Sequence, residues 1–201
     1  GSGREPIEGG KEKVKQIRWH GRGGNGAFTA ARLLGVAASV FEGKSAQAFP
    51  SFGPERRGAP VLGFTRIADK TITDHSQVYE CDCVIVLDET LCDVTNVAAG
   101  LKPDGVLVIN TRKTADEAAR HIGFEDPSRI VVLDATDIAL ELLGNPIVNT
   151  IMLGAAVGAT EMVSMESVEK AIDDVMGRNL REKNKKAARA AYDKVKEAVM
   201  Q

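Results

Sequence analysis

The residues best suited to hold a ligand form a glycine-rich segment, Gly21-Arg22-Gly23-Gly24-Asn25-Gly26. Its glycines fit the G-x-G-x-x-G spacing, which permits a tight turn and a close approach of the backbone to a ligand. A predicted strand precedes the segment and a predicted helix follows it, so backbone N–H groups and the helix dipole would favour an anion. Arg22 adds a positive charge, and Asn25 could cap the helix or bind the ligand directly. We predict contact with a phosphate or another polar ligand; the alternative is a tight turn without a ligand.

A nicotinamide dinucleotide fits this segment less well. Dinucleotide sites place an acidic residue at the end of the second strand, about 20 residues further on, to hold the ribose. Residues 45–50 read Ser-Ala-Gln-Ala-Phe-Pro and contain no acid, while Glu42 lies at the end of the predicted helix, before the strand. A stand-alone nucleotide-binding module of the Rossmann type is therefore kept only as an alternative.

Polar residues also stand at the ends of predicted strands. Asp88, Asn110-Thr111 and Asp134 follow runs of Val, Ile and Leu, and His20 ends the strand before the glycine segment. Ligands of open parallel sheets bind outside the carboxyl ends of the strands. Each polar residue could instead cap the helix that follows it. We predict a cap for Asp134 and take Asp88, Asn110 and Thr111 as candidates for a site or an interface, with capping as the alternative.

A third candidate group lies in a stiff loop at residues 49–60, which contains three prolines and two glycines. This composition excludes a regular helix or a central strand. The loop carries Glu55, Arg56 and Arg57. Adjacent arginines usually form a solvated patch, but arginines on a stiff loop favour a placed function or a subunit contact.

The three cysteines are Cys81, Cys83 and Cys92. Their odd number and close spacing do not make a disulfide framework, and a reducing cytoplasmic location fits them. Zinc and iron–sulfur sites usually need four ligands in recognisable spacing, so we predict no metal or cluster on this chain. The sequence has no G-x-S-x-G, H-E-x-x-H or Walker lysine, and we predict no catalytic residues of its own.

Strands and helices must position these residues. Near-continuous Val/Ile/Leu runs indicate strands buried on both faces, which are typical of a parallel sheet. We predict strands at 16–20, 45–49, 83–87, 106–109 and 130–133, a hairpin of 61–67 with 71–74, and helices at 28–41, 90–99, 114–121, 150–162, 168–176 and 181–200. This alternation predicts an α/β fold, a Rossmann-like, doubly wound and mainly parallel sheet with a β-hairpin insertion and C-terminal helices.

Composition limits the function further. The chain has 201 residues, a formal net charge of -2 and only 4% aromatic residues, so we expect an aliphatic core and no nucleic-acid or membrane partner. Residues 1–15 are expected to be a flexible leader that begins with a tag remnant, Gly1-Ser2-Gly3. Residues 16–201 show no internal repeat and no clear linker, and we predict a single domain.

Five motifs taken together carry a family resemblance. They are IRWHGRGGNGA at 17–27, QAFPSFGPERRGAP at 47–60, VLDET at 86–90, DAT at 134–136 and NTIMLGA at 149–155. With them the chain resembles, from residue 17 to about residue 192, the gamma subunit or gamma domain of 2-oxoacid:ferredoxin oxidoreductases. The resemblance is greatest to the pyruvate:ferredoxin oxidoreductase (pyruvate synthase) type. The family usually has Gln where this chain has Asn25.

This resemblance implies a complex in which thiamine diphosphate with Mg²⁺ attacks a 2-oxoacid carbonyl, electrons pass through [4Fe-4S] clusters to ferredoxin, and the acyl group leaves on coenzyme A. It implies alpha, beta and delta-type partner subunits that hold thiamine diphosphate and the clusters, a possible homodimer, and a chain that is inactive alone. It also implies that the segment 21–26 faces coenzyme A or the active site. Pyruvate is the expected substrate; 2-oxoisovalerate, 2-oxoglutarate and oxalate are the alternatives.

Overall fold

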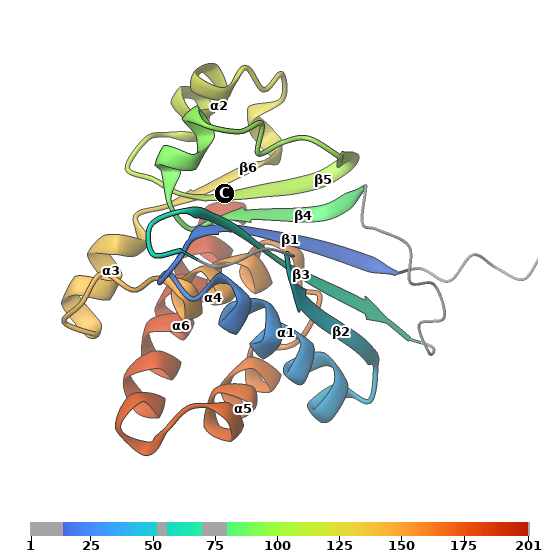
Figure 1. Ribbon diagram of the computed structural model, residues 1–201, viewed down its shortest axis with the longest axis vertical. Coiled ribbons are helices and arrows are strands. Elements are labelled where there is room, and N and C mark those ends of the chain that lie inside the picture. The colour runs from blue at the N-terminus through green and yellow to red at the C-terminus, as the bar shows by residue number, and fades with distance from the viewer. Residues whose placement is uncertain (1–13, 52–55, 70–79, 201) are drawn as a thin grey trace, which may run out of the picture.

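The fold is built on one mixed sheet of six strands in the order β2-β3-β1-β4-β5-β6 (Figure 1). The computed structural model describes residues 14–51, 56–69 and 80–200. The strands are β1 (Lys15–Arg22), β2 (Ser45–Pro50), β3 (Pro60–Ala68), β4 (Cys81–Val86), β5 (Leu101–Asn110) and β6 (Ile130–Leu133). β1, β4, β5 and β6 run parallel to one another. Their carboxyl ends therefore meet along one side of the sheet, which we call the carboxyl edge.

Helices cover both faces of this sheet, as expected for a doubly wound α/β fold (Figure 1). They are α1 (Ala27–Glu42), α2 (Ala115–Ile122), α3 (Ala135–Leu142), α4 (Asn149–Thr160), α5 (Met165–Val175) and α6 (Arg178–Val199), with short 3-10 helices η1 (Glu89–Asp93) and η2 (Pro127–Arg129). One hydrophobic cluster lies under α1, α3, α4, α5 and α6, and a second lies under η1 and α2 on the opposite face. The predicted fold class is confirmed. β1 begins at Lys15, which was expected to belong to the leader.

The antiparallel part of the sheet differs from the expected hairpin. β3 pairs antiparallel with β2 on one side and with β1 on the other. Both edges of β3 are therefore occupied, and the prediction that 61–67 pairs with 71–74 is wrong; residues 71–74 lie outside the described residues. An alternating run reveals that a segment is a strand but does not reveal its partner. The β-hairpin insertion into the mainly parallel sheet is instead the antiparallel pair of β2 and β3.

The predicted helix at 90–99 is also wrong, because only η1 forms there. The Asp88 carboxylate accepts a hydrogen bond from the Thr90 backbone N–H at 3.0 Å, and the Asn96 amide oxygen accepts one from the Ala98 N–H at 3.2 Å. Such short polar side chains offer the backbone an alternative to helical hydrogen bonds. The other predicted helices are confirmed, and Ser164 caps α5.

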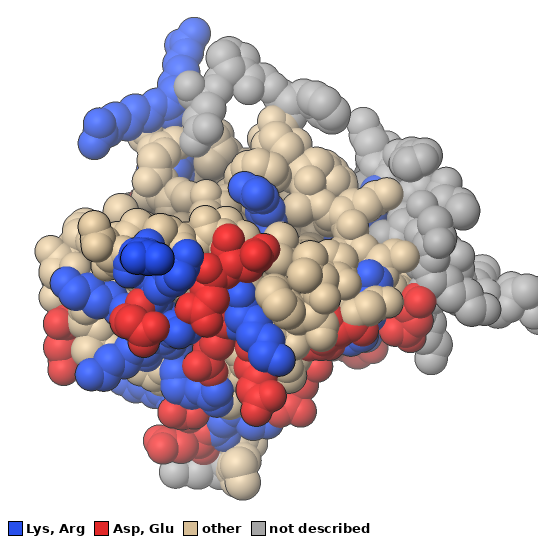
Figure 2. All heavy atoms as spheres, turned by 90° about the horizontal axis from the view of Figure 1, so that it is seen from below, with Lys and Arg blue, Asp and Glu red and all other residues tan. Residues whose placement is uncertain are grey.

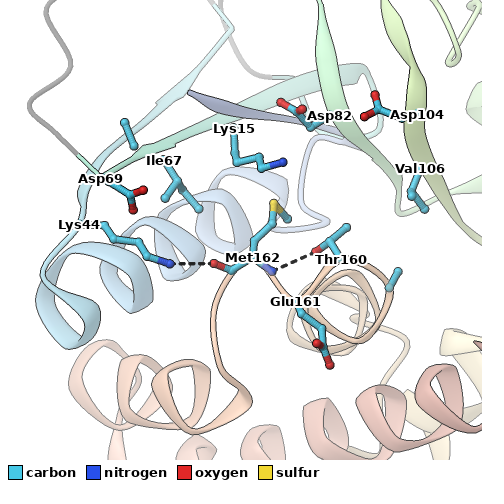
Figure 3. Close-up of a pocket in the computed structure, with 12 residues that line it drawn as sticks. Lys15, Lys44, Ile67, Asp69, Asp82, Asp104, Val106, Thr160, Glu161 and Met162 are labelled. Carbon is cyan, nitrogen blue, oxygen red and sulfur yellow. Dashed lines mark hydrogen bonds between the residues drawn. The ribbon is translucent and has the colours of Figure 1, made fainter. Parts of the chain in front are cut away.

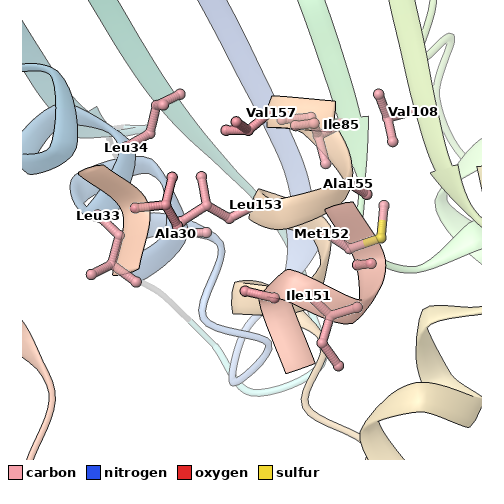
Figure 4. Packing of buried hydrophobic residues seen from close by; sticks show 14 of the residues in the cluster. Ala30, Leu33, Leu34, Ile85, Val108, Ile151, Met152, Leu153, Ala155 and Val157 are labelled. Atoms are coloured by element: carbon pink, nitrogen blue, oxygen red, sulfur yellow. The ribbon is translucent and has the colours of Figure 1, made fainter. Parts of the chain in front are cut away.

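Helix α4 occupies the centre of the larger hydrophobic cluster. Its residues from Asn149 to Gly158 are buried. Figure 4 shows its side chains between those of α1 and those of the sheet, with the labelled residues Ile151, Met152, Leu153, Ala155, Val157, Ala30, Leu33, Leu34, Ile85 and Val108. Helix α6 packs parallel to α4 so closely that a Cβ atom at Gly154 would lie 2.1 Å from the Ala188 carbonyl oxygen.

The outer surface of α5 and α6 carries charges of both signs. Figure 2 shows Lys and Arg interleaved with Asp and Glu over this face. Lys185 lies 2.9 Å from Asp173, and Arg189 pairs with Glu169. None of the described helices is both long and apolar enough to cross a membrane.

The two cysteines of β4 are structural. Cys81 and Cys83 are fully buried free thiols, and burial raises the pKa of both, which keeps them uncharged. They pack as small hydrophobic residues, as predicted.

Candidate functional site

The glycine-rich segment is a strand end followed by a short turn. Gly21 and Arg22 are the last residues of β1, and only residues 23–26 leave the strand before α1 begins. Gly24 and Gly26 have φ angles of +94° and +77°. L-amino acids with side chains rarely adopt such angles, so these two glycines are required by the backbone of the turn. The predicted arrangement of strand, turn and helix is confirmed.

Gly23 is required for a different reason, which lies within the chain itself. A Cβ atom there would lie 2.0 Å from the Arg56 carbonyl oxygen. The Gly23 N–H donates to the Ala59 carbonyl at 2.8 Å, and the Gly58 N–H donates to the Gly23 carbonyl at 3.0 Å. At Gly23, the group that approaches the backbone closely is therefore the segment 56–59, where a ligand was expected.

Arg22 joins this segment to the next strand end. Its Nε lies 3.3 Å from Asp88 Oδ2, and its Nη2 donates to Thr90 Oγ1 at 2.9 Å. Its Nη1 donates to the Gly58 carbonyl at 3.0 Å. The guanidinium thus connects the glycine turn, the segment 56–59 and the residues after β4, while its side chain keeps 25% of its surface exposed.

Asn25 does not cap α1, so that expectation is wrong. No side chain caps this helix, whose N-cap residue is Gly26. Instead, Asn25 Oδ1 accepts a hydrogen bond from the Arg22 backbone N–H at 2.7 Å and closes the turn. The Asn25 side chain also lines the cleft described next.

A cleft of about 570 Å³ opens at the carboxyl edge, where α1 leaves β1 on one face and η1 leaves β4 on the other. Ligands of doubly wound sheets bind at such a switch point. The cleft brings together four of the predicted residues, Asn25, Asp88, Asn110 and Thr111, with Asp134. The remaining lining residues are Leu87, Glu89, Thr90, Arg112, Thr136, Asp137, Leu140, Pro146 and Val148.

Three of the four acidic residues that line the cleft are paired with cations. Glu89 Oε2 lies 3.2 Å from Lys113 Nζ and accepts a hydrogen bond from Thr111 Oγ1 at 2.6 Å. Asp134 lies 3.6 Å from Arg112 and caps α3, as predicted, by accepting from the Asp137 N–H at 3.1 Å. Asp88, described above, both caps η1 and pairs with Arg22. These ion pairs offset the negative charge of the wall.

Asn110 has a different set of partners. Its Nδ2 donates to the Leu87 carbonyl and to Thr136 Oγ1, each at 3.0 Å. Its Oδ1 accepts from the Ala135 N–H at 3.0 Å. It therefore does not cap α2, the helix that follows β5, and the capping alternative is wrong for Asn110.

The arginines of the loop lie beside the glycine turn. Arg56 and Arg57 are exposed, and the backbone of Arg57 forms an isolated bridge with Gly23. The backbone that carries these two cationic residues is thereby held beside the turn that precedes α1. Glu55 lies outside the described residues.

His20 is buried away from the cleft, although it stands near the end of β1. Only 5% of its surface is exposed. Its Nε2 accepts a hydrogen bond from Arg18 Nε at 2.8 Å. Burial, followed by the charge of Arg18, lowers the pKa of His20 from 6.5 to about 3, so the ring is neutral.

The apolar wall of the cleft was not predicted from the sequence. Leu140, Pro146 and Val148 reach it from α3 and from the connection before α4. No spacing rule places these residues next to Asp88. Arg112 and Thr136 were also missed, although each lies within two residues of a predicted one.

A second cavity, of about 470 Å³, lies at the opposite edge of the sheet (Figure 3). It is lined by Lys15, Asp82 and Asp104, which lie on β1, β4 and β5, and by the chain after α4, where Lys44 Nζ donates to the Met162 carbonyl at 3.2 Å. None of the predicted site residues that the structure describes lines it. Within the described ranges, no group of three His, Cys, Asp or Glu side chains is arranged to hold a metal ion.

Comparison with known proteins identifies the family. The family model described as pyruvate ferredoxin/flavodoxin oxidoreductase matches residues 16–194. The chain is 51% identical over 179 residues to the pyruvate/ketoisovalerate oxidoreductases common subunit gamma of Pyrococcus furiosus, covering 89% of this chain and 96% of that one. It is 54% identical over 180 residues to the pyruvate synthase subunit PorC of Methanocaldococcus jannaschii, covering 90% and 96%.

A solved structure agrees with these matches. The crystal structure of pyruvate oxidoreductase subunit PORC from Thermotoga maritima has a TM-score of 0.78 and 40% identity, covering 90% of this chain and 97% of that one. The resemblance drawn from the sequence motifs is confirmed. This chain belongs to the pyruvate ferredoxin/flavodoxin oxidoreductase family, in which it matches gamma subunits over almost its whole length.

Proposed function

We propose that this chain is the gamma subunit of a cytoplasmic pyruvate synthase. In this reaction, pyruvate, coenzyme A and two oxidised ferredoxins give acetyl-CoA, carbon dioxide, a proton and two reduced ferredoxins. The bond between the carboxylate and carbonyl carbons of pyruvate breaks, its two electrons reduce ferredoxin, and a thioester bond to coenzyme A forms. The match of nearly the whole chain to gamma subunits carries this proposal.

In this proposal, the partner subunits carry out catalysis and electron transfer. Thiamine diphosphate with Mg²⁺ supplies the nucleophile for the pyruvate carbonyl, and [4Fe-4S] clusters carry the electrons to ferredoxin, all on alpha, beta and delta-type chains. The gamma chain acts as one domain, which begins at Lys15 with the first residue of β1, and its carboxyl edge contacts these subunits. This edge includes Asp88, Asn110, Thr111, Arg56 and Arg57, and we propose that Glu55 also contributes to the contact with the partner subunits.

We further propose that the turn at 21–26 handles coenzyme A. The phosphates of coenzyme A are anionic, and the N-terminus of the sixteen-residue helix α1 favours an anion. The exposed Arg56 and Arg57 add positive charge beside the same turn, whereas the charge of Arg22 is paired with Asp88. Asn25, in place of the usual Gln, closes the turn through its contact with the Arg22 N–H.

Reconstitution tests the main proposal. The alpha, beta and delta-type partners are purified together, with and without this chain, and reduction of ferredoxin is measured with pyruvate and coenzyme A. We expect no turnover by this chain alone and recovery of activity when all subunits are combined. Full activity of the partners without this chain would refute the proposal.

The coenzyme A role needs a separate test in the complete complex. Replacing both Arg56 and Arg57 by Ala should raise the apparent KM for coenzyme A about tenfold and leave the KM for pyruvate unchanged. The matched control replaces two exposed lysines of α6, Lys183 and Lys186, by Ala. If both double variants raise the KM for coenzyme A equally, or if neither raises it, a specific role of the arginines is excluded.

A second candidate substrate is 2-oxoisovalerate. The relative from Pyrococcus furiosus is named as a subunit common to pyruvate and ketoisovalerate oxidoreductases. Ferredoxin reduction is measured with pyruvate, 2-oxoisovalerate, 2-oxoglutarate and oxalate, using complexes formed with different sets of partner subunits. The result shows whether this chain serves a single enzyme or is shared by two.

A further inference from the structure

Asn110 joins the ends of three neighbouring strands with one side chain. Both hydrogens of its amide nitrogen are used, one by the Leu87 carbonyl after β4 and one by Thr136 Oγ1 after β6. Its amide oxygen accepts from the Ala135 N–H, also after β6. Asn110 itself ends β5, between these two strands. No other residue type of this size supplies two donors and an acceptor in this arrangement.

This bonding is not needed by the helix that follows Asn110. Helix α2 has its own capping box, in which Thr114 Oγ1 accepts from the Glu117 N–H and the Glu117 carboxylate accepts from the Thr114 N–H. By contrast, Asp88 and Asp134 each cap the next helical turn of the chain. The side chain of Asn110 therefore reaches sideways, across the floor of the cleft.

The contact with Leu87 leads to the glycine turn. The Leu87 carbonyl belongs to the peptide bond that precedes Asp88, so its position sets where the Asp88 carboxylate lies. That carboxylate lies 3.3 Å from Arg22 Nε and accepts a hydrogen bond from Thr90. Arg22 in turn donates to the Gly58 carbonyl, on the segment that carries Arg56 and Arg57. A continuous series of contacts thus runs from the Asn110 amide to the cationic side of the site.

We propose that Asn110 is a positioning residue for the coenzyme A site: its amide fixes the Leu87–Asp88 peptide and, through Asp88 and Arg22, the place of the glycine turn and the segment 56–59. Asn110 does not touch the coenzyme in this arrangement. The inference rests on the proposed coenzyme A role of the gamma chain.

The test uses the variant Asn110→Asp in the complete complex, which replaces the side-chain amide by a carboxylate. The new carboxylate still accepts from the Ala135 N–H, but it turns an anionic oxygen toward the Leu87 carbonyl, 3.0 Å away, where a donor stood. We expect the apparent KM for coenzyme A to rise about tenfold or more, because small misplacements of binding groups are costly. The kcat and the KM for pyruvate should stay within about twofold of the original values.

The matched control is Asn96→Asp. Asn96 is exposed, and its amide oxygen accepts from the nearby Ala98 N–H, a bond that a carboxylate can also accept. The complex that carries Asn96→Asp should have an unchanged KM for coenzyme A. Asp88→Asn interrupts the same series further along, and it should raise that KM as well. In the double variant with both Asp88→Asn and Asn110→Asp, the two increases in the KM for coenzyme A should be less than additive.

The outcomes separate the inference from the function on which it rests. If the unchanged chain fails to restore activity to its partners, the proposed function fails; if activity is restored but replacing Arg56 and Arg57 by Ala leaves the KM for coenzyme A unchanged, the coenzyme A role fails. If activity is restored and Asn110→Asp lowers the melting temperature without changing the KM for coenzyme A, Asn110 is only structural and the inference is overturned. If that variant does not assemble, Asn110→Ala is measured in the same way, since water can reach the groups it frees; an unchanged KM overturns the inference here too.

Discussion

Two adjacent glycines in the turn serve different purposes at the scale of single residues. Gly23 makes room for the Arg56 carbonyl, whereas Gly24 has open space around it and a φ of +94°. Gly23→Ala must displace the segment 56–59 and should lower the free energy of unfolding by about 3 kcal/mol. Gly24→Ala only forces alanine into the left-handed region and should cost about 1 kcal/mol. Urea unfolding of the two variants measures the difference.

Hydrogen exchange adds a local readout to this prediction. In Gly23→Ala, the amides of residues 58 and 59 should exchange faster, because the Gly58 N–H loses its bond to the Gly23 carbonyl. The Gly24 variant should leave them protected. Equal stability and equal protection in both variants would contradict the role assigned to Gly23.

His20 should make the fold sensitive to acid. Its pKa is about 3 in the folded chain and 6.5 as a free side chain. Between these values the unfolded chain binds one more proton, so stability rises with pH, by about 1.4 kcal/mol per pH unit from this group. This contribution is complete above pH 6.5 and is lost as the pH falls toward 3.

The variant His20→Gln isolates this contribution. Glutamine keeps an oxygen that can accept from Arg18 Nε but does not titrate. Urea unfolding between pH 4.5 and 7 should show a smaller slope of stability against pH in the variant. The same slope in both proteins would mean that His20 does not control this dependence.

At the scale of elements, buried apolar runs were a sufficient signal for the parallel strands. The runs predicted at 83–87, 106–109 and 130–133 overlap β4, β5 and β6, because strands that are covered on both faces consist of short, nearly continuous apolar runs. The place of β3 between β1 and β2 could not be predicted, since it depends on pairing across the sheet rather than on local pattern. The missing helix at 90–99 depends on two side chains, Asp88 and Asn96, that bond to the backbone.

Close packing of α4 against α6 reverses the usual effect of replacing a helical glycine. In an isolated helix, Gly→Ala stabilises by about 1 kcal/mol. At Gly154 the added Cβ would lie 2.1 Å from the Ala188 carbonyl oxygen, so Gly154→Ala should instead destabilise by about 1–3 kcal/mol. The control is Gly35→Ala in α1, where the nearest atom lies at an ordinary 3.6 Å and the change should be neutral or stabilising. Urea denaturation compares them, and equal effects would contradict this account.

At the scale of the whole molecule, the location of the site followed from topology. Asp88 lies far from Asn110 and Thr111 in the sequence, but β4 and β5 run parallel and bring these residues together at one edge. The sequence could therefore indicate the polar wall of the cleft. It could not indicate that the segment 56–59 is tied to Gly23, or that Leu140 and Val148 form the apolar wall, because these contacts depend on how loops and helices pack.

The division of labour in the complex gives a final prediction. A relative that is 51% identical is named as a subunit common to two oxidoreductases, so one gamma chain can serve enzymes for different 2-oxoacids. We therefore expect the preference between pyruvate and 2-oxoisovalerate to follow the partner subunits. In hybrid complexes that pair this chain with either partner set, the ratio of kcat/KM values should match that set within about twofold. The variant with Arg56 and Arg57 replaced by Ala should raise the KM for coenzyme A in both hybrids. A substrate preference that moves with the gamma chain would assign specificity to this chain instead.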